Sequence, residues 1–340
     1  MRAYCVWLIG GAVAICLVNA AIVFAIDPHN RLGRNSSGVY DWVERQHTAA
    51  AIQRVPHNAA FFSNSKLFMV NPAKLERFDW FNGAFGAANV EEIVGYLDAF
   101  VEDQRVVVVA VDFWGFHADS PGVAEPGLPE AARESLFHYL FNSAMLHRGL
   151  MTLWHRSKGK APLILPGGYI NPEVYQAKLD RLLANPNWRM MVEFGDQEFD
   201  ATFRLAHERI EMLAAVRDRL EAHGVLFVLV LHPQHPGLLR RLESETLAPH
   251  FDQFRHAILA EFPEAIDLSE AYPDSSAYIA GDPMHYRPEI AVEFFNERVI
   301  PEIERRFARQ KKSRRRPKAA AARDSKPDDQ AVAGEEVRPR

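Results

Sequence analysis

Cysteine is nearly absent from this chain of 340 residues, which contains only Cys5 and Cys16. Both lie in or beside the first apolar segment, so the rest of the chain has no disulfide and no cysteine-based metal site. Such cysteine usage is compatible with the cytoplasm and with the bacterial periplasm. It excludes a disulfide-stapled fold but does not fix the compartment.

An excess of positive charge is also lacking, since 39 Lys and Arg stand against 44 Asp and Glu, a formal net charge of -5. This balance gives no global reason to expect nucleic acid as a partner. The length is sufficient for one large domain or two modest ones. We expect no nucleic-acid partner and no cofactor.

One long apolar run, Val6–Ile26, is interrupted only by Asn19 and is long enough to cross a bilayer as a helix. A cleavable signal peptide is the alternative, but the run is longer than usual for one, and only Arg2 precedes it. We therefore expect residues 1–26 to form an uncleaved anchor in the bacterial inner membrane, which residues 6–26 cross.

The charges that flank this run are nearly balanced, because Arg2 opposes Arg31 and Arg34. The very short N-terminal tail favours an N-in orientation. The expected location is a single-pass inner-membrane protein whose soluble domain faces the periplasm.

Three segments are expected after the anchor. Residues 27–55 are predicted to be a juxtamembrane stalk with a helix around 40–54, and residues 56–308 an α/β domain. Residues 309–340 begin with a dense Lys/Arg run and are predicted to be a disordered tail. That run either contacts anionic lipid or glycan, or is simply solvated.

Strand and helix patterns alternate through residues 56–308, which predicts a parallel sheet flanked by helices. The predicted strands end at Phe62 or span Phe78–Phe81, Val106–Val111, Leu226–Leu231 and Ala265–Leu268, and the predicted helices are Asn89–Phe100, Phe203–Ala222 and Pro288–Phe307. The alternation lapses over about 113–200. This insertion is expected to form helices over one edge of the sheet, either shaping substrate access or only packing there.

Two polar stretches predict one active site. Ser63-Asn64-Ser65-Lys66 follows the first strand, and Asp282-Pro283-Met284-His285 forms a loop before the last helix. A serine nucleophile needs a base to accept its proton, and a histidine oriented by an aspartate supplies one. The alternatives are a hydroxyl that only caps a turn and an aspartate that only caps the last helix.

These blocks resemble the SGNH, or GDSL-like, hydrolase superfamily, and most of all its membrane-anchored bacterial branch, which includes relatives of periplasmic polysaccharide O-acetyltransferases. The resemblance covers about residues 56–307 without the insertion. It implies a flavodoxin-like sheet with Ser65 as nucleophile, His285 as base and Asp282 as its partner. It also implies an oxyanion hole formed by the backbone amides of Ser65 and Gly86.

The chain departs from the family pattern at two positions. Ser63 replaces the glycine of the first block, so we expect Ser63→Gly to be tolerated or beneficial. Asp112 replaces an asparagine that donates to the oxyanion. An ionised carboxylate cannot donate, so Asp112 is expected to orient a neighbour or cap the next element.

The candidate pocket residues are Lys66, Asn82, Asp112, His232 and Tyr286. His232 and His235 lie three positions apart and would hold a metal only with further ligands, and the sequence identifies none. We predict no metal site.

The predicted function is a membrane-anchored serine acyl esterase or O-acyltransferase acting on cell-envelope carbohydrate. Its expected partners are an acylated carbohydrate or acyl donor and, as a further candidate, envelope acyltransferase machinery. The alternatives are a non-catalytic domain of the same fold that binds a glycan or an envelope protein, and a structural anchor protein without a ligand.

Overall fold

The structure is a computed structural model that describes residues 2–35, 37–39, 44–100, 103–119, 135–185 and 201–310. The part of the predicted tail from residue 311 onward lies outside these ranges. Parts of the predicted stalk (36 and 40–43) and of the predicted insertion (120–134 and 186–200) also lie outside them.

A five-stranded parallel sheet confirms the predicted α/β class. Its strand order is β2-β1-β3-β4-β5. The strands are β1 (Ala59–Phe62), β2 (Trp80–Asn82), β3 (Val106–Val111), β4 (Leu226–Leu231) and β5 (Ile266–Asp267). The chain extends the sheet first on one side of β1 and then on the other, so the direction of winding switches between β1 and β3. Ligands of such doubly wound sheets bind at the carboxyl ends of the strands beside this switch.

Both faces of the sheet are covered, which explains why β3 and β4 are apolar without alternation. All residues of these two strands are buried. Val107 and Val109 belong to the apolar cluster on one face, and Val106 and Val108 to the cluster on the other. The first face is covered by α3 (Val90–Phe100), α10 (His207–Ala222) and α12 (Ala248–Glu261), and the second by α13 (Pro288–Phe294) and the π-helical segment Phe295–Val299.

Several further elements are short. They are α2 (Glu44–Ile52), α11 (Pro236–Leu242), the antiparallel pair β6 (Tyr278–Ile279) and β7 (Asp282–Tyr286), and the 3₁₀ turns η1 (Pro72–Lys74), η2 (Phe113–Phe116) and η3 (Ser275–Ala277). The predicted helix from residue 288 to about 307 runs through the π-helical segment and on to the end of the described chain.

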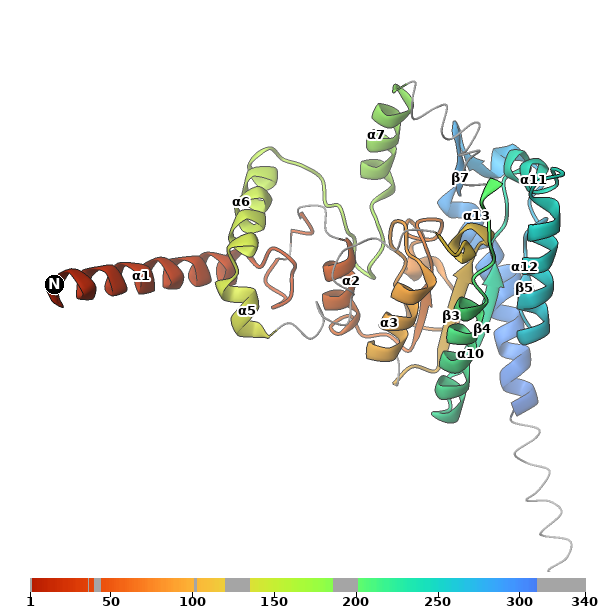
Figure 1. Cartoon of the computed structure of the whole chain (residues 1–340), viewed down its shortest axis with the longest axis horizontal. Helices are drawn as coiled ribbons and strands as arrows, with labels where there is room; N and C mark the ends of the chain where they lie inside the picture. Colours follow the sequence, from red (N-terminus) through yellow and green to blue (C-terminus); the bar gives the residue numbers. More distant parts are fainter. Residues whose placement is uncertain are drawn as a thin grey trace, which may run out of the picture.

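The sequence predicted that the helices of the insertion lie over one edge of the sheet, but two of them lie elsewhere. The helices α5 (Leu136–Phe141) and α6 (Ser143–Ser157) pack against α1 (Arg2–Ile26), away from the sheet (Figure 1). Val23 of α1 and Tyr139 of α5 share a small apolar cluster there. Helix α7 (Pro172–Leu183) reaches the end of the sheet at which β7 lies (Figure 1).

Helix α1 extends away from the α/β domain (Figure 1). Its segment Ala3–Ile26 has 24 residues with a mean hydropathy of 2.5, so its length and composition suffice to cross a membrane. Most of its side chains are exposed, and those that pack on the protein gather near the C-terminal end, at Asn19, Val23 and Ile26.

Candidate active site

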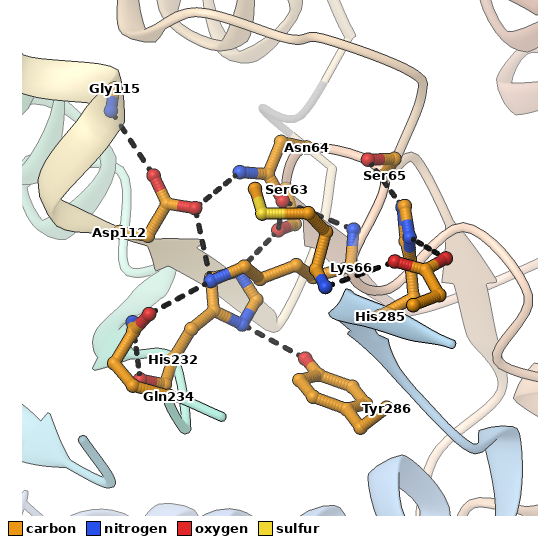
Figure 2. A network of polar contacts seen from close by, with 12 residues as sticks. Ser63, Asn64, Ser65, Lys66, Asp112, Gly115, His232, Gln234, His285 and Tyr286 are labelled. Atoms are coloured by element: carbon orange, nitrogen blue, oxygen red, sulfur yellow. Dashed lines mark hydrogen bonds and ion pairs between the residues drawn. The ribbon is translucent and has the colours of Figure 1, made fainter. Parts of the chain in front are cut away.

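The polar residues predicted from the sequence meet at the carboxyl end of the sheet. The stretch Ser63–Lys66 follows β1, Asp112 follows β3 and His232 follows β4. Parallel strands end at the same edge, so residues far apart in sequence become neighbours there. This edge holds two separate hydrogen-bond systems, one partly exposed and one buried (Figure 2).

The partly exposed system joins Ser65, His285 and Asp282. His285 Nε2 lies 2.8 Å from Ser65 Oγ, and His285 Nδ1 lies 2.7 Å from Asp282 Oδ2. Asp282 is buried, whereas Ser65 and His285 are partly accessible. The structure therefore brings together all three residues proposed from the sequence as a triad, although Ser65 and His285 are 220 positions apart.

This geometry fixes the direction of proton transfer. A carboxylate at Asp282 accepts a hydrogen bond from Nδ1–H of His285, which selects the tautomer with a free lone pair on Nε2. That lone pair accepts the hydroxyl hydrogen of Ser65. The three side chains are placed like a nucleophile, a base and a carboxylate that orients the base.

The prediction of a loop over residues 282–285 was wrong. Asp282–Tyr286 is strand β7, and it pairs with β6. Gly281, in the turn between the two strands, has a positive φ of 77°. The last helix begins after Arg287 without a side-chain cap, so Asp282 does not cap it. A strand holds the two side chains more rigidly than a loop, which favours a fixed spacing between the carboxylate and the imidazole.

Two aromatic residues that sequence reasoning missed hold the imidazole. Tyr175 of α7 places its hydroxyl 3.2 Å from His285 Nδ1 and 3.4 Å from Asp282 Oδ2. Phe68 stacks on the His285 ring at a centroid distance of 5.5 Å. No motif marks either residue, because Tyr175 belongs to the insertion and Phe68 to the turn after Lys66.

The buried system begins at Tyr286 and ends in the loop that carries Ser65. The Tyr286 hydroxyl lies 2.9 Å from His232 Nδ1, and His232 Nε2 lies 2.6 Å from Ser63 Oγ. The Ser63 hydroxyl donates to Asn64 Oδ1 at 3.5 Å. A neutral His232 donates from one ring nitrogen and accepts at the other, so the Ser63 and Tyr286 hydroxyls take opposite roles in this chain. Every link of this chain has one donor and one acceptor.

A buried ion pair completes this system. Lys66 Nζ lies 3.2 Å from Asp112 Oδ2 and donates to Gln234 Oε1, also at 3.2 Å. Asn64 Nδ2 donates to Asp112 Oδ2 at 2.9 Å, and the Gly115 amide donates to Oδ1 at 3.1 Å. Asp112 therefore both orients a neighbour and caps η2, as expected from the sequence.

The protonation states follow from these contacts. Burial opposes ionisation of Asp112, but the Lys66 ammonium and the hydrogen bonds from Asn64 and Gly115 outweigh it, so the Asp112 pKa is lowered. Burial and the nearby Lys66 charge lower the pKa of His232 to about 3, against the opposing effect of Asp112. His232 is therefore neutral at physiological pH, as its two hydrogen bonds require.

The five residues predicted to line a pocket are almost completely enclosed by the protein. Lys66, Asn82, Asp112, His232 and Tyr286 are each at most 4 % exposed, so they lie in the interior beneath the triad. Asn82 donates to the carbonyls of Leu67 and Val70, and its oxygen accepts from the Ala84 amide. These bonds hold the turn after β1 instead of facing a ligand.

The surroundings of Ser63 argue against the expectation that glycine can replace it. Its side chain is fully buried, and its hydroxyl is a hydrogen-bond partner of a buried neutral histidine. Glycine would leave His232 Nε2 without that hydrogen-bond partner. Ser63 supports the loop and is not a stand-in for a turn glycine.

Gly86 lies in the turn between β2 and α3, where its carbonyl accepts from Arg45 Nη2 at 3.2 Å. Arg45 also pairs with Glu92 of α3. These contacts tie Gly86 to the side of the sheet that α3 covers, and they do not link it to Ser65. Its amide as an oxyanion donor remains a prediction.

His232 and His235 do not converge. His232 points into the buried system, while His235 Nδ1 accepts from the Gly237 amide at 3.0 Å and caps α11. Among the residues that the structure describes, no group of three or more His, Cys, Asp or Glu side chains is arranged to hold a metal ion.

Comparison with known proteins gives no relative from which the role of a residue could be transferred to this chain. No family model, no curated protein and no solved structure matches this chain.

Proposed function

We propose that this protein is a serine-dependent acyl esterase or O-acyltransferase of the SGNH type. The observation that carries the proposal is the continuous hydrogen-bond chain from Ser65 through His285 to Asp282, with separations of 2.8 and 2.7 Å. These distances lie within the range in which a base accepts a proton from a hydroxyl nucleophile. The partial exposure of Ser65 and His285 leaves them open to a substrate.

The proposed reaction has two halves. Ser65 Oγ attacks the acyl carbonyl while its proton passes to His285 Nε2, and Asp282 stabilises the imidazolium that forms. The tetrahedral intermediate collapses to acyl-Ser65, and the leaving alkoxide takes the proton from His285. A water or a sugar hydroxyl then gives a proton to His285 and attacks the acyl group, and the bond between the acyl carbon and Ser65 Oγ breaks as Oγ takes that proton back from His285. Water as acceptor makes the protein an esterase, and a sugar hydroxyl makes it a transferase.

The proposed substrate is an acylated carbohydrate of the bacterial cell envelope, reached from the periplasmic face of the inner membrane. This part of the proposal rests on the resemblance of the sequence to the anchored branch of the family and on the apolar helix α1. The backbone amides of Ser65 and Gly86 are the proposed oxyanion donors. Envelope acyltransferase machinery is the proposed partner if a sugar is the acceptor.

The test is covalent labelling of the purified full-length protein by a fluorophosphonate, combined with an aryl-acetate assay. A single adduct on Ser65, absent from Ser65→Ala and from His285→Ala, is the expected result, with loss of aryl-acetate turnover in both variants. The exposed Ser143 provides the matched control, because Ser143→Ala should label and turn over like the wild type. Turnover that persists in Ser65→Ala would remove Ser65 from the reaction.

A further inference from the structure

The exposed large apolar side chains of the described residues are confined to one end of the molecule. They lie on α1 or on the two helices packed against it, and none lies on the α/β domain. On α5 and α6 they are Leu136, Phe137, Leu150, Leu153 and Trp154. A soluble surface rarely carries so many contiguous large apolar side chains unless they are covered by a partner or a membrane.

The position of α5 and α6 along α1 indicates what covers them. Asn19 of α1 donates to the Leu140 carbonyl of α5 at 3.2 Å, and Gly149 of α6 lies beside Ile26. Asn19 lies 16 positions beyond Ala3, the first residue of the apolar segment. That distance is about 24 Å along a helix axis, whereas the hydrocarbon core of a bilayer is about 30 Å thick. The contact therefore begins before α1 has crossed the core.

The chemistry of the two helices suits a lipid surface. Residues 135–160 contain no Asp or Glu, and their charged residues Arg148, Arg156, Lys158 and Lys160 are all basic. Lys160 Nζ lies 5.0 Å from the centre of the Trp154 ring. Tryptophan and lysine of this kind occupy the boundary between acyl chains and headgroups, and basic residues attract anionic lipid.

The arrangement in space agrees with this position. Helices α5 and α6 lie across the C-terminal end of α1 and not along it (Figure 1). A helix that crosses a membrane-spanning helix in this way lies in the plane of the bilayer.

We propose that α5 and α6 form a collar embedded in the membrane interface, whose partner is the lipid bilayer itself. Leu136, Phe137, Leu150, Leu153 and Trp154 enter the acyl-chain boundary, and the exposed Lys158 and Lys160 meet anionic headgroups. The proposal rests on α1 as a membrane span, and it is independent of the proposed esterase chemistry. It makes the protein anchored at two depths, by a spanning helix and by an interfacial pair.

The test measures the depth of single spin labels in full-length protein reconstituted into phosphatidylcholine–phosphatidylglycerol vesicles. Oxygen reaches labels in lipid better than a water-soluble nickel chelate does, so the ratio of the two relaxation effects reports depth. Native Cys16, retained in a Cys5→Ala chain, marks the bilayer interior. Phe137→Cys and Leu153→Cys, each in a Cys5→Ala/Cys16→Ala chain, report the collar, and Ala222→Cys on the exposed end of α10 reports water.

The expected order of depth is Cys16 deepest, Phe137→Cys and Leu153→Cys intermediate, and Ala222→Cys in water. Collar labels as accessible to the nickel chelate as Ala222→Cys, with Cys16 still shielded, would overturn the collar and leave the span intact. An aqueous reading at Cys16 as well would overturn both. Spin–spin broadening at the collar labels that disappears on tenfold dilution with unlabelled protein would show a second copy on this face, and lipid would not be its partner.

Discussion

The hydroxyls of Ser63 and Ser65, two positions apart on one turn, are bound by different histidines. Ser65 Oγ lies 2.8 Å from His285 Nε2 in the partly exposed system, and Ser63 Oγ lies 2.6 Å from His232 Nε2 in the buried one. The buried histidine is neutral and fully enclosed, so it cannot exchange protons with a substrate. We therefore assign support of the fold to Ser63 and the role of proposed nucleophile to Ser65. Substitutions of the two serines should have different effects.

Replacing Ser63 should weaken the fold, while replacing Ser65 should leave it intact. Ser63→Ala leaves the buried His232 Nε2 without its hydrogen-bond partner, which should lower the free energy of unfolding by about 1–3 kcal/mol. Ser65→Ala removes a partly exposed hydroxyl, so its effect should be within about 0.5 kcal/mol. Chemical denaturation of both variants in detergent tests the difference. Equal stability of the two variants would contradict the supporting role of Ser63.

Asp282→Asn should abolish most acyl transfer without unfolding the protein. The amide keeps the shape of the carboxylate but no longer favours the Nδ1–H tautomer of His285, and it does not stabilise the imidazolium. We expect kcat to fall on the order of 10³–10⁴-fold. Asp274→Asn is the matched control, because Asp274 only caps η3 at the surface. An unchanged rate in Asp282→Asn would reduce this aspartate to a structural residue of β7.

Tyr175→Phe tests whether α7 positions the base. The variant keeps the ring that packs edge-on against Phe68 and His285 and removes only the hydroxyl 3.2 Å from Nδ1. A loss of one hydrogen bond in the orientation of His285 should lower kcat by about 2- to 13-fold, equivalent to about 0.5–1.5 kcal/mol, with little change in KM.

The control for Tyr175→Phe is Tyr272→Phe, whose hydroxyl contacts Glu293 on the surface. This change should leave both constants unaltered. A change in KM alone for Tyr175→Phe would place its hydroxyl in substrate binding and not in positioning of the base.

The buried histidines should make the protein less stable in mild acid. The folded-state pKa of His232 is lowered by burial to about 3, against an ordinary value of 6.5. Its stabilising contribution is complete above pH 6.5 and is lost as the pH falls toward 3, because only the unfolded chain binds the proton in that range. Each such histidine contributes a slope of about 1.4 kcal/mol per pH unit. His29 and His47, whose pKa values burial also lowers to about 3, act in the same direction.

The measurement is the free energy of unfolding between pH 7 and pH 4.5. His232→Gln should show a shallower decline than the wild type, because one titrating group has been removed. His207→Gln, at an exposed position, should retain the wild-type slope. Parallel curves for the wild type and His232→Gln would show that His232 does not stay neutral in the folded protein.

Gly281→Ala should disturb the triad through the turn between β6 and β7. Gly281 has a φ of 77°, and a Cβ placed there would lie 3.1 Å from Leu183 Cδ1 of α7. Gly224 has a similar φ of 81° but open space around it. Gly224→Ala should therefore lower the free energy of unfolding only by the cost of a left-handed backbone conformation, about 1 kcal/mol. Gly281→Ala should lower it by more and should also lower activity.

Leu183→Ala combined with Gly281→Ala should recover part of the additional loss, because it removes the side chain that the new methyl group meets. A double variant no better than Gly281→Ala would show that contact with α7 is not the cause. Thermal unfolding and aryl-acetate turnover, measured on all four proteins, give both readouts.

Sequence patterns were sufficient to predict the sheet and the triad for physical reasons. Apolar runs such as Val106–Val111 occur where a strand is buried on both faces, and polar residues at the ends of parallel strands are brought together by the topology. The buried system could not be predicted, because Ser63 and His232 meet across the end of β3 from positions 169 residues apart. Each residue alone matches a turn or a loop.

The partner of the insertion was also hidden in the sequence. Helix α6 presents Met145, Gly149 and Thr152 on its buried face, which is a helical spacing that fits any apolar surface. The pattern indicates an amphipathic helix but does not distinguish the sheet edge from α1. The strand character of Asp282–Tyr286 was hidden for a similar reason, since its pairing with β6 involves very few residues.

The segment that leaves α1 is bound too firmly to act as a swivel. Asp27 is fully buried, and its carboxylate accepts from the amides of Leu32 and Arg34 and from the Tyr139 hydroxyl of α5. Connections between a membrane helix and an outer domain commonly permit free reorientation. Here the first turn after α1 folds back around the Asp27 carboxylate, which also binds α5. A rotation of α1 about its own axis must therefore also move α5.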